Sequence, residues 1–384
     1  HYDLNGRNAQ YFPKANVPFA ESFDKITLRA GWDPEDDYLM LDGYSGGSHG
    51  HQDCNAIIGY TAAGKHWLVD GEYIRQAPKY HSAVTVVRDG VAVRNPAMAR
   101  LDDAVWYDDA AICQTTIPNY NGVRWTRYLF WRPNEFTAVI DELTAVKPGD
   151  YSLCCCWRVY GQSTLDGHQL NVRQDDARFR MQNLSADRLE LVQIKNVGKL
   201  PVRHLYQRRS RRLEKGQSVC FVNVFGASRG DDVPFTAALC GERRAAIRAG
   251  DSSWIAGAGP LDTSDVRIDA RAWLADAHGI RLASATDCTV DKRSVWHSEE
   301  PVAVQILGPA LAVATARATP HAEQRPVLNV GRPSAKRLDA PLRLDMGQLC
   351  ASVDPRPLSK ATALAAARPL PISWRFDDFP RTPK

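Results

Sequence analysis

The sequence predicts an all-β fold, a multi-layer antiparallel β-sandwich. Short runs rich in Val, Ile, Tyr, Trp, Phe and Thr recur about every 8 to 12 residues as far as about residue 320. Gly, Asp, Asn and Pro separate these runs, which are too short or too rich in β-branched residues for amphipathic helices. A chain with this many consecutive strands can bury their inner faces only if its sheets stack on one another. We therefore expect more than two layers.

The clearest expected strands are, in chain order, residues 66–70, 82–90, 137–146, 151–161, 218–226 and 301–308. A helical pattern is confined to brief pieces such as residues 238–250. We assign residues 1–317 to one multi-layer sandwich. From about Ala318 onward Pro, Arg and Ala accumulate, which predicts that residues 318–384 are a C-terminal return segment or a small extension packed on the sandwich.

Composition narrows the functional classes. The 384 residues are 44% hydrophobic, enough for a sizeable core, and the net charge of +4 gives no support to nucleic-acid binding. Arg, Asp or Gly interrupts every long apolar run before the roughly 20 residues that a membrane span needs, so none is expected. Because the sequence opens on His1 and not on Met, we expect a processed or excised piece of a longer protein.

The nine cysteines do not predict a disulfide framework. Their number is odd, and residues 154–156 are three consecutive cysteines in a strand-like run, where neighbours point to opposite faces. None of the pairs has the CxxC spacing of a zinc or redox site, so we expect most of them to be small buried residues.

A cluster of ligand-type residues lies in "GGSHGHQDCNAIIGYTAAGKHWLVD", residues 46–70. His49, His51 and Asp53 alternate, so an extended strand would project them from one face. Asp70 ends the next expected strand, and His81 precedes another. Imidazole and carboxylate are ligands that zinc accepts.

Spacing alone does not bring these groups together. A two-residue hairpin turn at Ala63 and Gly64 would pair Asp70 with Ile57, which leaves His51 roughly 20 Å further along the strand. The glycine-rich approach to His51 could let the chain bend back. In the alternative interpretation, the histidines are polar loop residues and Asp70 begins a turn.

Residues 26–90 resemble the metal-containing β-sandwich portion of the heparinase II/III-like polysaccharide lyases. The matching features are Arg29, Gly31 and Trp32, the HGHxD element, a hydrophobic hairpin that closes on Asp-Gly, and a histidine that starts a Val-rich strand. Members of this family join an N-terminal α-helical toroid to a C-terminal supersandwich of antiparallel sheets. The chain resembles the second part alone, so we expect it to lack the toroid.

The resemblance implies an enzyme that cleaves an acidic, uronic-acid polysaccharide by β-elimination, in the periplasm or outside the cell. It implies a zinc ion held by His51, Asp70 and His81, and places His49 toward the substrate cleft. Ser82 follows His81 where members usually have Asn, so this position cannot supply an amide.

Elimination requires that the substrate carboxylate is neutralised, the adjacent proton removed and the leaving oxygen protonated. His49 suits the first task, and Tyr73 and Tyr80 are the nearest candidates for the base and acid. The resemblance also implies a second essential Tyr or His on the helical toroid, which makes the toroid, on the same or a separate chain, an expected partner.

Other readings stay open. The chain could be a non-catalytic carbohydrate-binding or structural module that keeps the metal site for stability. As a strand, residues 124–132 would place Trp125, Arg127, Leu129 and Trp131 on one face and Thr126, Tyr128 and Phe130 on the other. The aromatic side chains could stack on sugar rings, but the pattern favours a strand buried on both faces.

Three further groups of polar residues were considered. The arginines of residues 203–216 could bind an anionic polysaccharide or nucleic acid, or they could lie on a solvated edge hairpin whose charge prevents pairing with other strands. The acidic residues Asp102, Asp103, Asp108 and Asp109 could supply the carboxylate pair of a glycosidase, but acidic clusters of this kind usually lie in exposed turns. The remaining histidines, including His204, have no ligand-like neighbours in the sequence, and no role is assigned to them.

Overall fold

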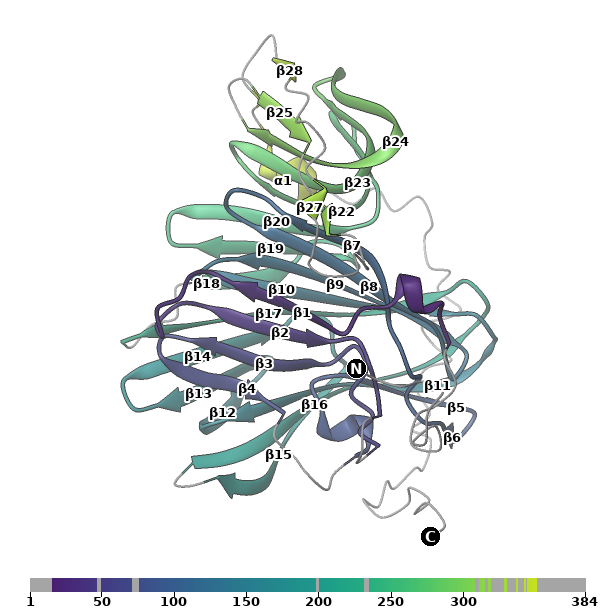
Figure 1. Ribbon diagram of the computed structural model, residues 1–384, viewed down its shortest axis with the longest axis vertical. Helices are drawn as coiled ribbons and strands as arrows, with labels where there is room; N and C mark the ends of the chain where they lie inside the picture. Colours follow the sequence, from purple (N-terminus) through teal and green to yellow (C-terminus); the bar gives the residue numbers. More distant parts are fainter. Residues whose placement is uncertain are drawn as a thin grey trace.

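The computed structural model consists of three large antiparallel sheets (Figure 1). The structure describes residues 16–46, 50–70, 76–197, 200–230, 235–307, 311–314, 317–318, 328–329, 336–337, 342 and 344–350. Within these ranges the helices are short: η2 (Phe19–Glu21), η3 (Pro78–Tyr80) and α1 (Met346–Cys350). The all-β, multi-layer sandwich is confirmed, and the described residues contain no helical toroid.

The first sheet has nine strands. Their order is β1 (Lys25–Arg29), β2 (Tyr38–Asp42), β3 (Ile57–Ala62), β4 (Lys65–Val69), β11 (Gly149–Tyr160), β16 (Leu200–Leu213) and β15 (Arg188–Val197), with β5 (Val84–Arg88) beside β11 and β6 (Val91–Ala92) beside β5.

The central sheet has ten strands. Their order is β12 (Gln162–Asp166), β13 (Gln169–Gln174), β14 (Ala177–Asn183), β17 (Ser218–Arg229), β10 (Phe136–Ala145), β9 (Val123–Arg132), β8 (Ala111–Tyr120), β7 (Arg100–Trp106), β26 (Arg317–Ala318) and β27 (Leu328–Asn329).

The third sheet also has nine strands and lies at the top of Figure 1. Their order is β18 (Phe235–Leu239), β19 (Arg244–Ala249), β20 (Ser252–Ala258), β22 (Val266–Asp276), β23 (Gly279–Val290), β24 (Arg293–Leu307), β25 (Leu311–Ala314) and β28 (Lys336–Arg337), with β21 (Leu261–Asp262) beside β22.

Strand β9 shows how the layers are built. Trp125, Leu129 and Trp131 belong to the apolar core between the first and central sheets. Tyr128 and Phe130 belong to the core between the central and third sheets. The prediction that residues 124–132 form a strand buried on both faces is therefore confirmed, because an apolar core covers each face.

A third apolar core covers the other face of the third sheet, where the buried side chain of Leu349 on α1 packs. The helix at residues 238–250 was expected wrongly, because β19 occupies residues 244–249. In β19 Ala245, Ile247 and Ala249 are buried between more accessible neighbours, which is the alternation of a strand.

Described pieces of residues 318–384 lie against the sandwich. Strand β27 joins the central sheet through β26, β28 joins the third sheet through β25, and α1 packs near β20 and β22. None of the helices in the described ranges is long and apolar enough to cross a membrane. Seven of the nine cysteines are buried and all are free thiols, as the sequence predicts.

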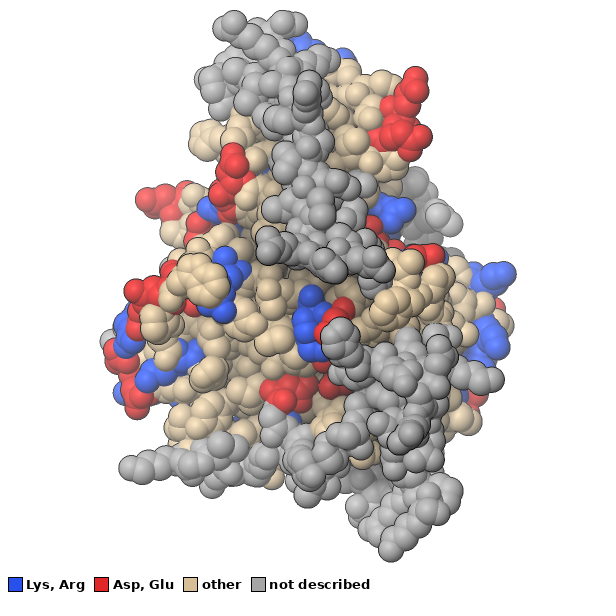
Figure 2. Space-filling model, in the orientation of Figure 1, with Lys and Arg blue, Asp and Glu red and all other residues tan. Residues whose placement is uncertain are grey.

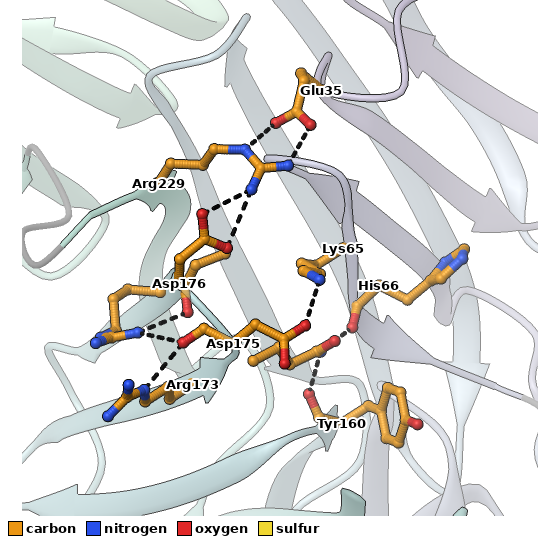
Figure 3. Close-up of polar contacts among 11 residues, drawn as sticks. Glu35, Lys65, His66, Tyr160, Arg173, Asp175, Asp176 and Arg229 are labelled. Atoms are coloured by element: carbon orange, nitrogen blue, oxygen red, sulfur yellow. Dashed lines mark hydrogen bonds and ion pairs between the residues drawn. The ribbon is translucent and has the colours of Figure 1, made fainter. Parts of the chain in front are cut away.

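Surface ion pairs join the first two sheets at one edge (Figure 3). Arg229 at the end of β17 binds Glu35, from the connection between β1 and β2, and also binds Asp176. Lys65 at the start of β4 binds Asp175 at 2.6 Å. On the face shown in Figure 2, basic and acidic side chains are interspersed along this edge.

Candidate metal centre

The loop between β2 and β3 folds back on itself. Gly46 and His51 exchange two backbone hydrogen bonds, and the Ala56 N–H donates to the Asp53 carbonyl at 2.9 Å in a tight turn. Asn55 has φ of +64° in this turn, the left-handed conformation that Asn tolerates better than most residues. Residues 51–56 are therefore not an extension of β3, which is why the straight-hairpin distance between His51 and Asp70 does not apply.

A bulge in the next hairpin also changes the register. Ala63 and Gly64 form the expected two-residue turn, both with positive φ. The ladder shifts by one residue between Tyr60 and Thr61, so Tyr60 pairs with Leu68 and Gly59 pairs with Val69. A one-residue shift moves the following side chains to the opposite face, so the bulge determines where Asp70 points.

Four ligand-type side chains meet here. The ligand atoms of His51, Asp53 and His81 all lie within 4.8 Å of one another, and the two histidine rings meet edge-on with centroids 5.5 Å apart. Both carboxylate oxygens of Asp70 lie 2.8 Å from Nδ1 of His81. The structure thus groups His51 and His81 with Asp53, while Asp70, the third ligand that the resemblance implies, contacts Nδ1 of His81.

The donor atoms fit a zinc ion. Nε2 of His81 is buried and has no hydrogen-bond partner among the described residues, so it remains available as a ligand. Two imidazoles with carboxylates are a common zinc donor set. A carboxylate on the other nitrogen of a ligating histidine is also typical, since it fixes the ring and raises its basicity.

The charges of the site favour a bound cation. Burial, together with the carboxylates of Asp42 and Asp70, raises the pKa of Asp53 to about 7. Burial opposes protonation of His81, but the Asp70 carboxylate outweighs burial, so the pKa of His81 rises. Buried carboxylates that crowd one another are stabilised by a positive charge placed among them.

Of the other expected site residues, Tyr80 lies beside this centre. It ends η3 directly before His81, is half-buried, and packs edge-on against the buried ring of His204 at 5.8 Å. Nδ1 of His204 lies 3.1 Å from the Tyr206 hydroxyl. Sequence spacing gave no role to His204 because its strand is distant in the chain. His49 and Tyr73 lie outside the described residues.

The remaining sequence candidates have structural partners. In β16, Arg208 binds Glu190 and Arg211 binds Asp187. The expected edge hairpin is wrong for residues 203–208, which pair with β11 on one side and with β15 on the other.

The acidic residues between 102 and 109 bind partners as well. Asp102 accepts from Arg100 at 2.6 Å, and Asp109 accepts from Arg281 Nε at 3.0 Å. Asp103 is buried and accepts from the Ser284 hydroxyl at 2.6 Å. The contacts of Asp103 and Asp109 connect the central sheet to the third sheet, and Asp102 is paired within β7.

Comparison of the sequence with models of known families finds no match, and comparison with curated proteins finds no significant match. Solved structures do match. A heparinase III superposes with a TM-score of 0.50 at 13% identity, over 63% of this chain and 42% of that one. Another heparinase III gives 0.47 at 12% identity, over 67% and 40% of the two chains.

A mutant of the heparan sulfate lyase HepC from Pedobacter heparinus gives a TM-score of 0.47 at 15% identity, over 75% of this chain and 43% of the lyase. The chain therefore spans less than half the length of these structures. At such identities the similarity is one of fold, and the fold of this chain resembles part of a heparinase III.

Proposed function

We propose that this chain is the β-sandwich part of a zinc-containing polysaccharide lyase that cleaves an acidic, uronic-acid glycan by β-elimination. The observation that carries the proposal is the grouping of His51, Asp53 and His81, with Asp70 bound to Nδ1 of His81. The motif resemblance of residues 26–90 and the fold similarity to a heparinase III support it. Such a protein would act in the periplasm or outside the cell.

In this proposal His51, Asp53 and His81 hold the zinc ion, His81 through its Nε2, and Asp70 orients the His81 ring through Nδ1. A bound zinc ion supplies a fixed positive charge that offsets the clustered carboxylates. We assign it a structural role: it fixes the loop after β2 and the segment before β5 relative to each other. Neighbouring side chains, and not the zinc ion, then carry out the proton transfers of the β-elimination.

The proposed steps need two kinds of group. His49, two residues before a ligand, donates a hydrogen bond to the substrate carboxylate and stabilises the enolate-like intermediate. Tyr80 removes the proton beside that carboxylate and returns a proton to the leaving oxygen, a role for which Tyr73 is the second candidate. The Tyr80 ring packs edge-on against the ring of His204, which restricts its orientation.

A helical toroid is the proposed second wall of the cleft. Because this chain covers 42% of the matched heparinase III, we expect residues 1–384 alone to turn over substrate slowly or not at all. Adding the toroid, in the same chain or as a separate one, should restore turnover. Full activity of residues 1–384 would mean that the sandwich holds the whole catalytic set.

The test is a panel of uronic-acid polysaccharides incubated with the complete protein. A lyase forms a new carbon–carbon double bond in its product, so the ultraviolet absorbance of the solution rises on at least one polymer. If the protein is folded and carries metal but gives no absorbance on any polymer, the chain is a non-catalytic carbohydrate-binding or structural module.

A further inference from the structure

A buried arginine contacts both segments of the metal centre. Arg127 lies in the middle of β9, and the side chains of Arg127 and its partner Asp141 are fully buried. Its Nε and Nη2 donate to the two oxygens of Asp141 at 2.8 and 3.0 Å. Trp125 Nε1 also donates to Asp141, at 2.7 Å. The guanidinium is therefore fixed on one side by the central sheet.

The remaining nitrogen reaches across to the first sheet. Nη1 of Arg127 donates to the carbonyl of Asn55 at 2.6 Å and to the carbonyl of Ser82 at 3.2 Å. Asn55 lies two residues after Asp53, and Ser82 directly follows His81. One guanidinium thus binds the backbone of both segments that carry the candidate ligands.

Backbone hydrogen bonds connect both segments to the first sheet, since the Asn55 N–H donates to the Asp42 carbonyl at 2.8 Å and the Ile57 N–H donates to the Ser82 carbonyl at 3.1 Å. Residues 52–56 lie between an isolated bridge and β3, and residues 81–83 lie between η3 and β5. A second side chain supports the same turn, since the Thr115 hydroxyl donates to Oδ1 of Asn55 at 2.6 Å. The arginine therefore adds side-chain hydrogen bonds to those that the backbone already makes here.

We propose that Arg127 is a positioning residue that sets the separation of His51 and Asp53 from His81, and thereby the metal affinity of the site. This inference rests on the proposed metal centre. The role requires arginine, because a planar fork binds a carboxylate through two nitrogens and still donates to two carbonyls. A lysine keeps the charge but cannot make these contacts together.

The experiment compares Arg127→Lys with the unaltered chain. Zinc affinity is measured by competition with a chelating dye, and site geometry by the visible spectrum of the cobalt-loaded protein. We expect zinc binding to weaken about 10- to 100-fold, as for other residues that orient ligands, and the cobalt bands to shift. Both readouts report the site and not turnover.

Arg281→Lys is the matched control. The Arg281 side chain is 3% exposed and pairs with Asp109 and Asp276, outside the candidate metal centre. This variant should lose thermal stability but keep the zinc affinity and the cobalt spectrum of the unaltered chain. An equal loss of affinity in both variants would mean that general destabilisation explains the effect, which overturns the inference.

The other outcomes are also decisive. Unchanged affinity and spectrum in Arg127→Lys would overturn the positioning role while leaving the metal centre intact. If the unaltered chain binds neither zinc nor cobalt, the proposed metal centre is wrong and this inference fails with it. Should Arg127→Lys not fold, Trp125→Phe loosens Asp141 without removing a charge. That variant should weaken zinc binding several-fold, and unchanged affinity would contradict the inference.

Discussion

Nδ1 of His81 lies 2.8 Å from both carboxylate oxygens of Asp70, although the two residues are 11 positions apart in the chain. Their side chains are 0% and 5% exposed. A buried carboxylate this close to a histidine either shares its metal or orients its ring, and both roles make the pair essential for metal binding.

The first prediction separates the two carboxylates of the site. Asp53→Asn should lose the bound zinc because it removes a ligand, whereas Asp70→Asn, which loosens the His81 ring, should bind zinc about 10- to 100-fold more weakly. Zinc content after dialysis against a weak chelator measures the difference.

Asp37→Asn is the control for this pair, since Asp37 is a buried carboxylate held by Asn134 and should keep the metal. If Asp53→Asn retains zinc and Asp70→Asn loses it, the roles are exchanged and the ligands are His51, Asp70 and His81, as the resemblance implies.

The second prediction concerns pH and Asp37. Burial raises the pKa of Asp37 from 3.8 to about 7, so the folded protein binds this proton more tightly than the unfolded chain does. The free energy of unfolding therefore falls as pH rises from about 4 to about 7, by at most about 4 kcal/mol from this group. Urea unfolding of the unaltered chain and of Asp37→Asn across this range measures it.

Only the difference between these two proteins tests Asp37, because other buried groups also titrate. Asparagine has the same shape and still accepts the backbone N–H of Asn134. The gain in stability of Asp37→Asn over the unaltered chain should grow with pH. A difference that stays constant with pH would show that Asp37 is not protonated in the folded protein at neutral pH.

The third prediction contrasts surface and buried ion pairs. Arg229→Gln should change the melting temperature only slightly, because the Arg229 network is exposed and salt screens it. Arg127→Gln should lower the melting temperature strongly, because it leaves the carboxylate of Asp141 buried without its partner. Melting curves at low and high salt compare them, and equal effects would contradict this assignment.

The fourth prediction tests Tyr80 in the complete enzyme. Tyr80→Phe should lower kcat about 10²- to 10⁴-fold, the range for loss of a general acid or base, while zinc content stays constant. Tyr151→Phe is the control, because the Tyr151 hydroxyl donates to the carbonyls of Gly122 and Lys147 and should affect stability alone. Wild-type kcat in Tyr80→Phe would transfer the role to Tyr73 or to the toroid.

The layered fold could be predicted from sequence because burial imposes a period of two on every strand. The alternation of Trp125 and Leu129 with Tyr128 and Phe130 already separates the two cores on either side of the central sheet. The same rule, applied to Arg244–Ala249, would have replaced the expected helix by a strand.

The site could be predicted only as a set of residue types. Its geometry depends on the turn at Asn55 and on the bulge between Tyr60 and Thr61, and no periodic pattern in the sequence predicts either feature. The role of Arg127 was missed because its partner lies in another strand. A signal was present, since Arg127 and Asp141 are charged residues in the middle of strands with long apolar runs, and they are directly paired across the ladder.

The metal centre is tested most directly by the zinc content of the purified protein and of three histidine variants. The unaltered chain should carry one zinc per chain, and His81→Ala should carry none and melt at a lower temperature. His49→Ala should keep the zinc, as should His297→Ala, whose side chain is 69% exposed. A full equivalent of zinc in His81→Ala, with its loss from His49→Ala, would contradict the assignment of ligands.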